Sequence, residues 1–225
     1  MKMAYRIKFL HRAVLILVLV CLFFVTENST GQETAEQYYK KGTEYAAQGS
    51  LDEAEAEFDN ALVIEPSNID IRLARAALYL QKGELDQAIA DYTKAIKIDP
   101  KFISAYLKRG FIYTLQGDYD LAKRDFDKAL ELNPFSADAY CGRSYLYNQQ
   151  EQYEKAIADA DKALELDPNW YLAYFNRGVA YEAMNNKVEA LKSYEAFLKH
   201  PPTDDTYVET MIEDVKEKTE ELSKE

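Results

Sequence analysis

The chain has 225 residues and a formal net charge of −12; 48% of its residues are hydrophobic and 29% are charged. This composition excludes an intrinsically disordered chain, and the acidity excludes nucleic acid and anionic lipid as general partners, because like charges repel. The two cysteines, Cys21 and Cys141, cannot form a CxxC metal pair or a disulfide framework, and neither histidine belongs to a ligand or catalytic motif. No cofactor or metal is therefore expected.

The N-terminus has the order of segments that is typical of a secretory signal peptide. Residues 1–12 are basic, residues 13–25 form an unbroken apolar run of 13, and a polar segment follows. The run is shorter than the ~20 residues that a membrane-spanning helix needs. The small residues Ser29 and Gly31 favour cleavage before Gln32, so we expect export to the periplasm, the cell envelope or the extracellular space.

Two alternatives remain open for residues 1–31. In the first, the segment stays uncleaved and residues 9–25 anchor the protein in a membrane. In the second, Cys21 is acylated as in a lipoprotein, although Val20 stands where a small residue is expected. Both alternatives also export the rest of the chain, and they restrict membrane contact to this segment.

Most of the remaining sequence repeats with a period of 34 residues, which is typical of stacked helical repeats. Within each copy, apolar and small residues recur at helical spacing in two blocks. The turn between the two blocks is marked by a glycine in the first three copies, namely Gly49, Gly83 and Gly117. In the fourth and fifth copies the same position holds Glu151 and Asn185, and a proline closes every copy. Each copy is therefore predicted to be a helix, a tight turn, a second helix and a break. The five copies span residues 35–68, 69–102, 103–136, 137–170 and 171–204.

Small residues recur at the eighth and twentieth positions of each copy, where they let the paired helices approach closely. The eighth positions hold Gly42, Ala76, Gly110, Ser144 and Gly178, and alanine fills every twentieth position. Tyrosine recurs at the eleventh position, as Tyr45, Tyr79, Tyr113, Tyr147 and Tyr181. Aromatic residues at helical spacing mainly fill cores, so we interpret this stripe as packing rather than as a base-stacking surface.

This pattern resembles the tetratricopeptide repeat family. The match also includes an aromatic residue at the fourth and twenty-fourth positions, alanine at the twenty-seventh and the closing proline. The resemblance implies an all-α fold, a right-handed superhelical solenoid of five tandem 34-residue helix-turn-helix repeats with a C-terminal capping helix. Arg72, Ala160 and Phe197 depart from the pattern. Ala160 is expected to leave the fourth repeat partly underpacked unless a neighbour such as Trp170 fills the space.

The seventh position of every copy is basic, and the twenty-third is acidic in four of the five copies. Because a guanidinium group matches a carboxylate in shape and charge, we predict ion pairs between the two helices of a repeat. Arg177 has Ser193 in place of its acid. The alternative, a row of arginines that binds an anionic ligand, is disfavoured because most of the arginines have a matching acid.

Residues 205–225 continue with Val208, Met211, Ile212, Val215 and Leu222 at helical spacing among charged residues. A stack of repeats needs a last helix that is apolar inside and polar outside, so we interpret this segment as a cap. A partner-binding helix is the alternative.

In the family that the sequence resembles, the first helix of each repeat lines a concave groove, and the ligands are often peptides. That resemblance implies a partner-binding groove formed by Tyr39, Lys40, Leu73, Leu107, Lys108, Phe111, Cys141, Tyr145, Asn148, Phe175 and Asn176. The lysine–asparagine pair with which some members hold a C-terminal carboxylate is absent from the corresponding positions, which speaks against a chaperone adaptor. Exposed apolar and aromatic patches are typical of interaction sites.

These observations together predict a non-enzymatic scaffold that is exported and binds a protein or peptide partner in the groove. No nucleophile–base pair, metal cluster or phosphate-binding loop points to an enzyme. The alternative is a structural subunit whose solenoids associate with one another.

Overall fold

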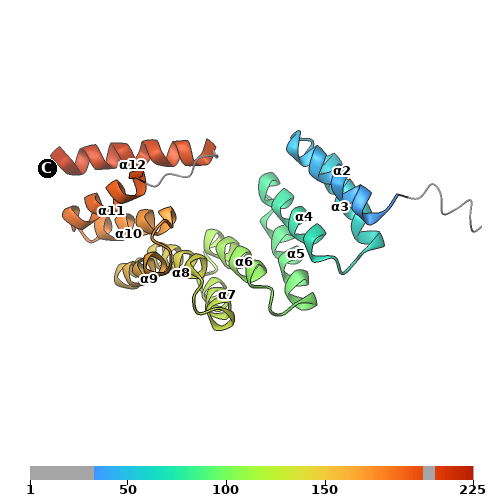
Figure 1. The fold of residues 1–225 in the computed structure, drawn as a ribbon, viewed down its shortest axis with the longest axis horizontal. Coiled ribbons are helices and arrows are strands. Elements are labelled where there is room, and N and C mark those ends of the chain that lie inside the picture. Colours follow the sequence, from blue (N-terminus) through green and yellow to red (C-terminus); the bar gives the residue numbers. More distant parts are fainter. Residues whose placement is uncertain (1–32, 200–205, 225) are drawn as a thin grey trace, which may run out of the picture. The chain divides into compact units, whose positions relative to one another are not determined.

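The computed structural model describes residues 33–199 and 206–224, and every regular element in these residues is an α-helix. The chain divides into two compact units, one ending at Ile71 and the other beginning at Arg72. Figure 1 shows the helices in chain order. The predicted all-α fold is thus confirmed. The predicted signal peptide or anchor lies outside the described residues, and within them no helix has the length and apolar character needed to span a bilayer.

The first unit is a helical hairpin of α2 (Ala35–Ala47) and α3 (Leu51–Ile64). Thr34 begins α2 with a capping box, in which its hydroxyl accepts from the Gln37 amide and the Gln37 side chain accepts from Thr34. A Cβ atom at Gly42 would lie 2.7 Å from the Phe58 ring, so only glycine lets this ring pack directly on the α2 backbone. The small eighth position therefore sets the distance between the two helices.

The second unit is a series of helices in which each hairpin contacts the next. The helices are α4 (Ile69–Lys82, which begins before the boundary), α5 (Leu85–Ile98), α6 (Ile103–Gln116), α7 (Tyr119–Leu132), α8 (Ala137–Gln149), α9 (Tyr153–Leu166), α10 (Tyr171–Ala183), α11 (Lys187–Lys199) and α12 (Thr206–Lys224). Three hairpins are formed by α6 with α7, by α8 with α9, and by α10 with α11. Successive hairpins are joined by contacts of α5 with α6, of α7 with α8, and of α9 with α10. Each of these hairpins falls inside one period of the sequence.

The turns inside the hairpins use left-handed backbone conformations. Gly49, Gly83 and Gly117 have φ between 74° and 81°, which glycine adopts without steric cost. Glu151 and Asn185 take the same role with φ of 57° each. For a glutamate this conformation is strained, whereas asparagine tolerates it better.

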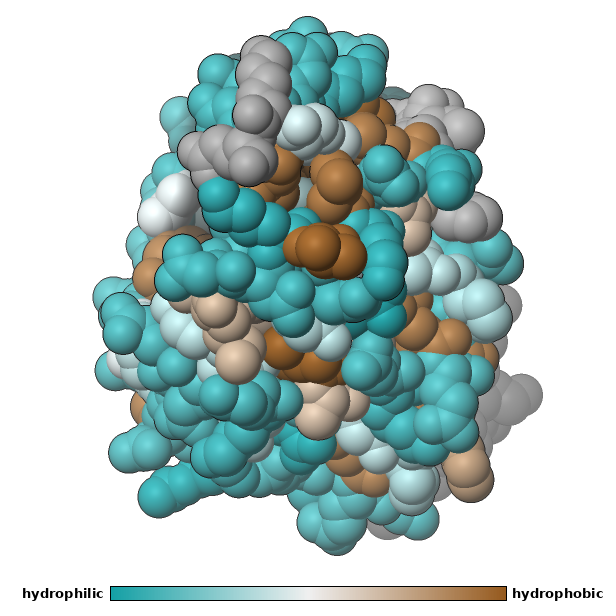
Figure 2. Space-filling view, turned by 90° about the vertical axis from the view of Figure 1, so that its left-hand side faces the viewer, coloured by the Kyte–Doolittle hydropathy of each residue, from teal (hydrophilic) through white to brown (hydrophobic). Residues whose placement is uncertain are grey.

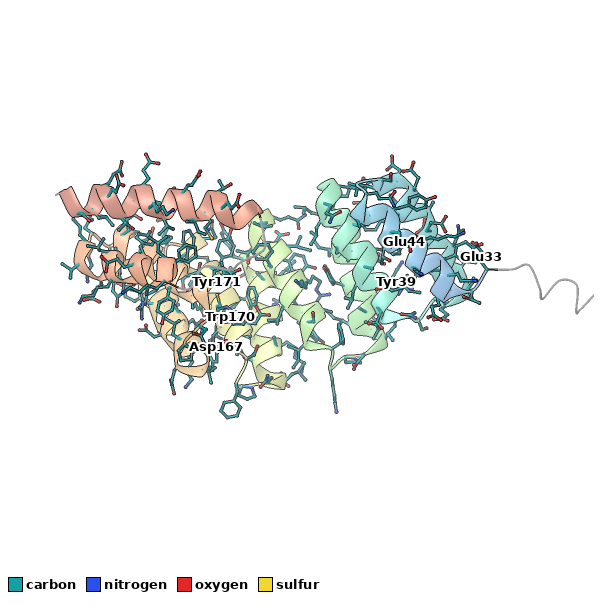
Figure 3. The ribbon with its side chains drawn as sticks, turned by 45° about the horizontal axis from the view of Figure 1, so that its top comes forward. Glu33, Tyr39, Glu44, Asp167, Trp170 and Tyr171 are labelled. Carbon is teal, nitrogen blue, oxygen red and sulfur yellow. The ribbon has the colours of Figure 1, made fainter. Side chains whose placement is uncertain are left out.

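The fourth repeat is filled from outside its own hairpin. Ala160 belongs to a buried cluster with Cys141, Ala163 and Ala173, and Trp170 packs against that cluster. Trp170 lies beside Tyr171 at the start of α10, after the loop that contains Asp167 (Figure 3). Trp170, the neighbour that the sequence offered to fill the space left by Ala160, therefore packs against the cluster that contains Ala160.

In the second unit, the arginine at the seventh position of each repeat binds the acid of its own hairpin wherever one is present. The bonds are Arg75–Asp91 at 2.7 Å, Arg109–Asp125 at 2.7 and 2.8 Å, and Arg143–Asp159 at 2.7 and 2.9 Å. The predicted ion pairs are confirmed for these three. The prediction is wrong for the first repeat, where Lys41 pairs with Glu33 and a buried carboxylate oxygen of Glu57 has no hydrogen-bond partner among the described residues. Arg72 also donates to Asp91, at 3.2 Å, so this departure from the aromatic pattern joins the ion-pair network.

The arginines of the last three repeats also bind the second helix of the preceding repeat. In each case the Nη1 atom of the arginine is the donor. The bonds are Arg109 to Thr93 at 2.9 Å, Arg143 to Asp127 at 2.6 Å, and Arg177 to Asp161 at 2.7 Å. Each of these acceptors lies 16 residues before its arginine in the sequence. This repeat-to-repeat bond was not predicted. It also gives Arg177 a carboxylate partner, in addition to Ser193 at 3.1 Å.

Helix α12 packs its apolar side on the last hairpin. Val215 is completely buried in a cluster with Tyr194 and Phe197, and Met211, Ile212 and Leu222 pack against this cluster. Lys218 lies 3.3 Å from Glu182 at the end of α10. The exposed residues of α12 are mostly charged, and the surface seen from this end of the molecule is mainly hydrophilic with separate apolar patches (Figure 2).

Candidate binding surface

In the second unit, the exposed Phe111 and the half-buried Tyr145 of the predicted groove lie on α6 and α8, which contact each other. The Phe111 and Tyr145 rings lie 5.6 Å apart between centroids, and Phe111 is 45% exposed. Leu115, one turn after Phe111 on α6, is 50% exposed. Lys108, one turn before Phe111, is also exposed. These side chains form what we call the aromatic surface: Lys108, Phe111, Leu115 and Tyr145.

Three residues predicted to line the groove are buried instead, and this part of the prediction is corrected. Cys141, Asn148 and Asn176 are 4%, 8% and 5% exposed. The Asn148 amide donates to the Asn176 carbonyl at 2.8 Å, and the Asn176 amide donates to the Cys141 carbonyl at 3.1 Å. Because these bonds join α8 to α10, the three side chains hold adjacent first helices together and are not available to a partner.

The Cys141 thiol is chemically quiet. Burial raises its pKa to about 12, and the Trp170 and Asn176 side chains next to it offset that effect only in part. A thiolate is the reactive form of cysteine, and at neutral pH this thiol stays protonated. The described residues also contain no group of three or more His, Cys, Asp or Glu side chains that could hold a metal ion.

The remaining predicted residues of the second unit are half-buried. Leu107 packs against two core clusters, which include Tyr106 and Phe126. The Phe175 ring lies 5.9 Å from Phe197, so it serves the core beneath α12. Leu73 is half-buried as well.

The first unit carries two of the predicted residues. Tyr39 is half-buried with its ring 6.0 Å from Phe58, while Lys40 is exposed and lies 3.9 Å from Glu44. Tyr39, which is labelled in Figure 3, adjoins a pocket of about 130 Å³, and half of the residues that line this pocket are acidic. The pocket is lined by Glu36, Tyr39, Glu65, Asn68, Asp70 and Ile71.

Sequence reasoning located Phe111 and Tyr145, but it did not find Leu115. It also could not separate exposed from buried residues on the first helices. The signal for Leu115 was its place one turn after Phe111, on the same side of a helix. The burial of Asn148 and Asn176 had no comparable signal, because asparagine is usually exposed.

Comparison with known proteins agrees with the repeat pattern. A family model described as "TPR repeat" matches residues 42–83, 77–117 and 144–185, and models described as "Tetratricopeptide repeat" match residues 103–136, 126–158 and 172–203. No curated protein matches the chain.

Several solved structures are similar to the chain. A tetratricopeptide repeat protein from Parabacteroides merdae is 25% identical, with 88% of this chain and 78% of that chain covered and a TM-score of 0.71. The MamA protein is 26% identical, with 75% and 92% covered and a TM-score of 0.63. YrrB, described as having an unusual peptide-binding site, is 20% identical, with 85% and 97% covered and a TM-score of 0.58. The likeness to YrrB shows the fold alone.

Proposed function

Because this chain belongs to the tetratricopeptide repeat family, we propose that it is a non-enzymatic scaffold that binds a peptide or protein partner. The partner contacts the aromatic surface on α6 and α8. The scaffold is exported and works in the cell envelope or the extracellular space, as the basic and apolar N-terminal segment suggests.

The observation that carries the proposal is the aromatic pair formed by the exposed Phe111 and the half-buried Tyr145. Phe111 and Tyr145 come from two adjacent first helices, and the Phe111 ring remains 45% exposed even though Tyr145 lies against it. Large rings held by rigid helices lose little conformational freedom on binding, so they are efficient anchors for a partner. Leu115 extends the apolar area, and Lys108 gives it a polar edge.

A catalytic role has no support at this surface. The thiol of Cys141 is buried with a pKa of about 12. The side chains of the aromatic surface offer apolar contact and one cation, which suits recognition rather than bond making or breaking.

The test is capture of a partner from the native envelope by the immobilised protein, read out by mass spectrometry. Phe111→Ala combined with Tyr145→Ala should weaken capture about tenfold or more, since central aromatic anchors dominate binding energy. Phe135→Ala is the matched control, because Phe135 is 76% exposed but lies in the loop between α7 and α8.

Circular dichroism should show the same helical signal in all variants. Undiminished capture by the double variant would reject the aromatic surface and direct attention to the second helices or to α12. An equal loss in the Phe135 variant would show that exposed aromatic residues bind non-specifically.

A further inference from the structure

The interface between consecutive repeats has one recurring polar contact in the second unit. The arginine of a first helix binds a residue on the preceding second helix, as in Arg143–Asp127 and Arg177–Asp161. The tyrosine four residues after the arginine is covered in the fourth repeat, where Tyr147 is 8% exposed. The interface thus has two halves. The first helix of a repeat supplies a cation and a tyrosine, and the second helix of the preceding repeat supplies an acid.

Helix α2 carries the first of these halves without a preceding repeat in the described part of the chain. Lys41 stands at the arginine position, and its side chain is 44% exposed. Tyr45, four residues later, is 37% exposed, in contrast to the covered Tyr147. The partner of Lys41 is Glu33, eight residues before it, rather than an acid on another helix.

Helix α11 carries the complementary half. Glu195 lies 34 residues after Asp161 and therefore occupies the acid position of the interface. It is exposed and forms no ion pair with the residues that the structure describes. An acid in this position would match Lys41 of α2 in charge and in register.

Helix α12 occupies the place on α11 where the first helix of a following repeat would lie. Met211 and Val215 lie 34 residues after Arg177 and Tyr181, so α12 continues the register of the first helices. Val215 is buried where the tyrosine of a repeat would be, but Met211 replaces the cation. Glu195 therefore has no cation opposite it.

We propose that a second copy of this chain can dock the outer face of its α2 on α11, with Lys41 against Glu195, and that α12 competes with this docking inside the chain. The contact joins different surfaces of the two copies, so it would extend head to tail into open stacks. With α12 in place, the chain stays monomeric.

The contacts of α12 are few enough for such competition. Of its described side chains only Val215 is fully buried, whereas α8 buries six residues. The ion pair of Lys218 with Glu182 is partly exposed and contributes little, since surface pairs are screened by water. The site that α12 covers is thus accessible to a stronger competitor.

The test is sedimentation velocity of the full chain from micromolar to millimolar concentration. The unchanged protein should sediment as a monomer. Val215→Asp places a charge in the buried site of α12, so α12 should dissociate and the average mass should rise about twofold or more with concentration. If this variant loses its helical signal, Leu222→Asp, at a partly buried residue near the end of α12, provides a milder way to release α12.

Charge reversal distinguishes the proposed contact from non-specific association. Adding Lys41→Glu to V215D should return the protein to a monomer, and adding Glu195→Lys as well should restore association. Lys40→Glu is the matched control, because Lys40 is the exposed neighbour on α2 and its change should leave association intact. A monomeric V215D protein, or equal effects of K41E and K40E, would overturn the proposal.

Discussion

The first and fourth hairpins are built from the same pattern, yet they are stabilised in opposite ways. In the first hairpin, Gly49 makes an unstrained turn, but Lys41 has a single exposed ion pair with Glu33. In the fourth, the turn places Glu151 in a left-handed conformation, but Arg143 binds two carboxylates, Asp127 and Asp159. The first repeat thus combines an unstrained turn with a weak ion pair, and the fourth combines a strained turn with stronger ion pairs, so the two contributions can be tested separately.

The largest expected effect is the difference in stability loss between removing Arg143 and removing Lys41. Arg143→Ala should destabilise the protein by about 2–4 kcal/mol, because it leaves the largely buried Asp159 carboxylate without its cation and removes one of the two cations, Arg143 and Lys123, that bind Asp127. Lys41→Ala should have a much smaller effect, because its ion pair with Glu33 is exposed to water. Urea unfolding of both variants measures the difference, and equal losses would contradict the comparison.

The turns should show smaller effects with opposite signs. Glu151→Gly should stabilise the protein by about 1 kcal/mol, because it removes a side chain from a left-handed conformation. Gly49→Ala should destabilise it by a similar amount for the converse reason. Asn185→Gly is the control, with a smaller gain expected because asparagine tolerates this conformation. Thermal unfolding should give the highest melting temperature for Glu151→Gly, a smaller increase for Asn185→Gly and a decrease for Gly49→Ala. A destabilised Glu151→Gly protein would show that the turn is not strained.

The smallest expected effect concerns pH and Asp127. Burial acts to raise the pKa of this carboxyl, but hydrogen bonds from Lys123 and Arg143 outweigh it and hold the pKa below its usual range. A carboxyl with a lowered pKa in the folded state stabilises the protein above its unfolded pKa of about 3.9 and loses that contribution as the pH falls further. Asp127→Asn should therefore cost about 0.5–1 kcal/mol at pH 7, a value reduced for the partial exposure of the carboxylate, and less at pH 3. Urea unfolding at the two pH values measures this, and a cost independent of pH would assign the effect to packing.

The sequence was sufficient to predict the helices and, for the arginines of the second unit, the ion pairs within hairpins, because both depend on residues at fixed spacing in one copy. The contacts between copies were harder to predict. Arg143 and Asp127 lie 16 residues apart, as do Arg143 and Asp159, so the sequence shows both acids but does not say which helix the arginine faces. The aromatic surface was predicted only in part for a similar reason. Whether Phe111 or Asn148 is exposed depends on how closely the next first helix approaches, and the pattern within one copy does not fix that distance.

The position of Trp170 has a practical consequence, because it is the single tryptophan of the chain. Its indole packs against a cluster shared by α8, α9 and α10, so its fluorescence reports on the junction of the fourth and fifth repeats and on little else. Circular dichroism averages over all helices instead. If the array unravels from one end rather than melting as a whole, the emission change and the loss of ellipticity will occur at different denaturant concentrations.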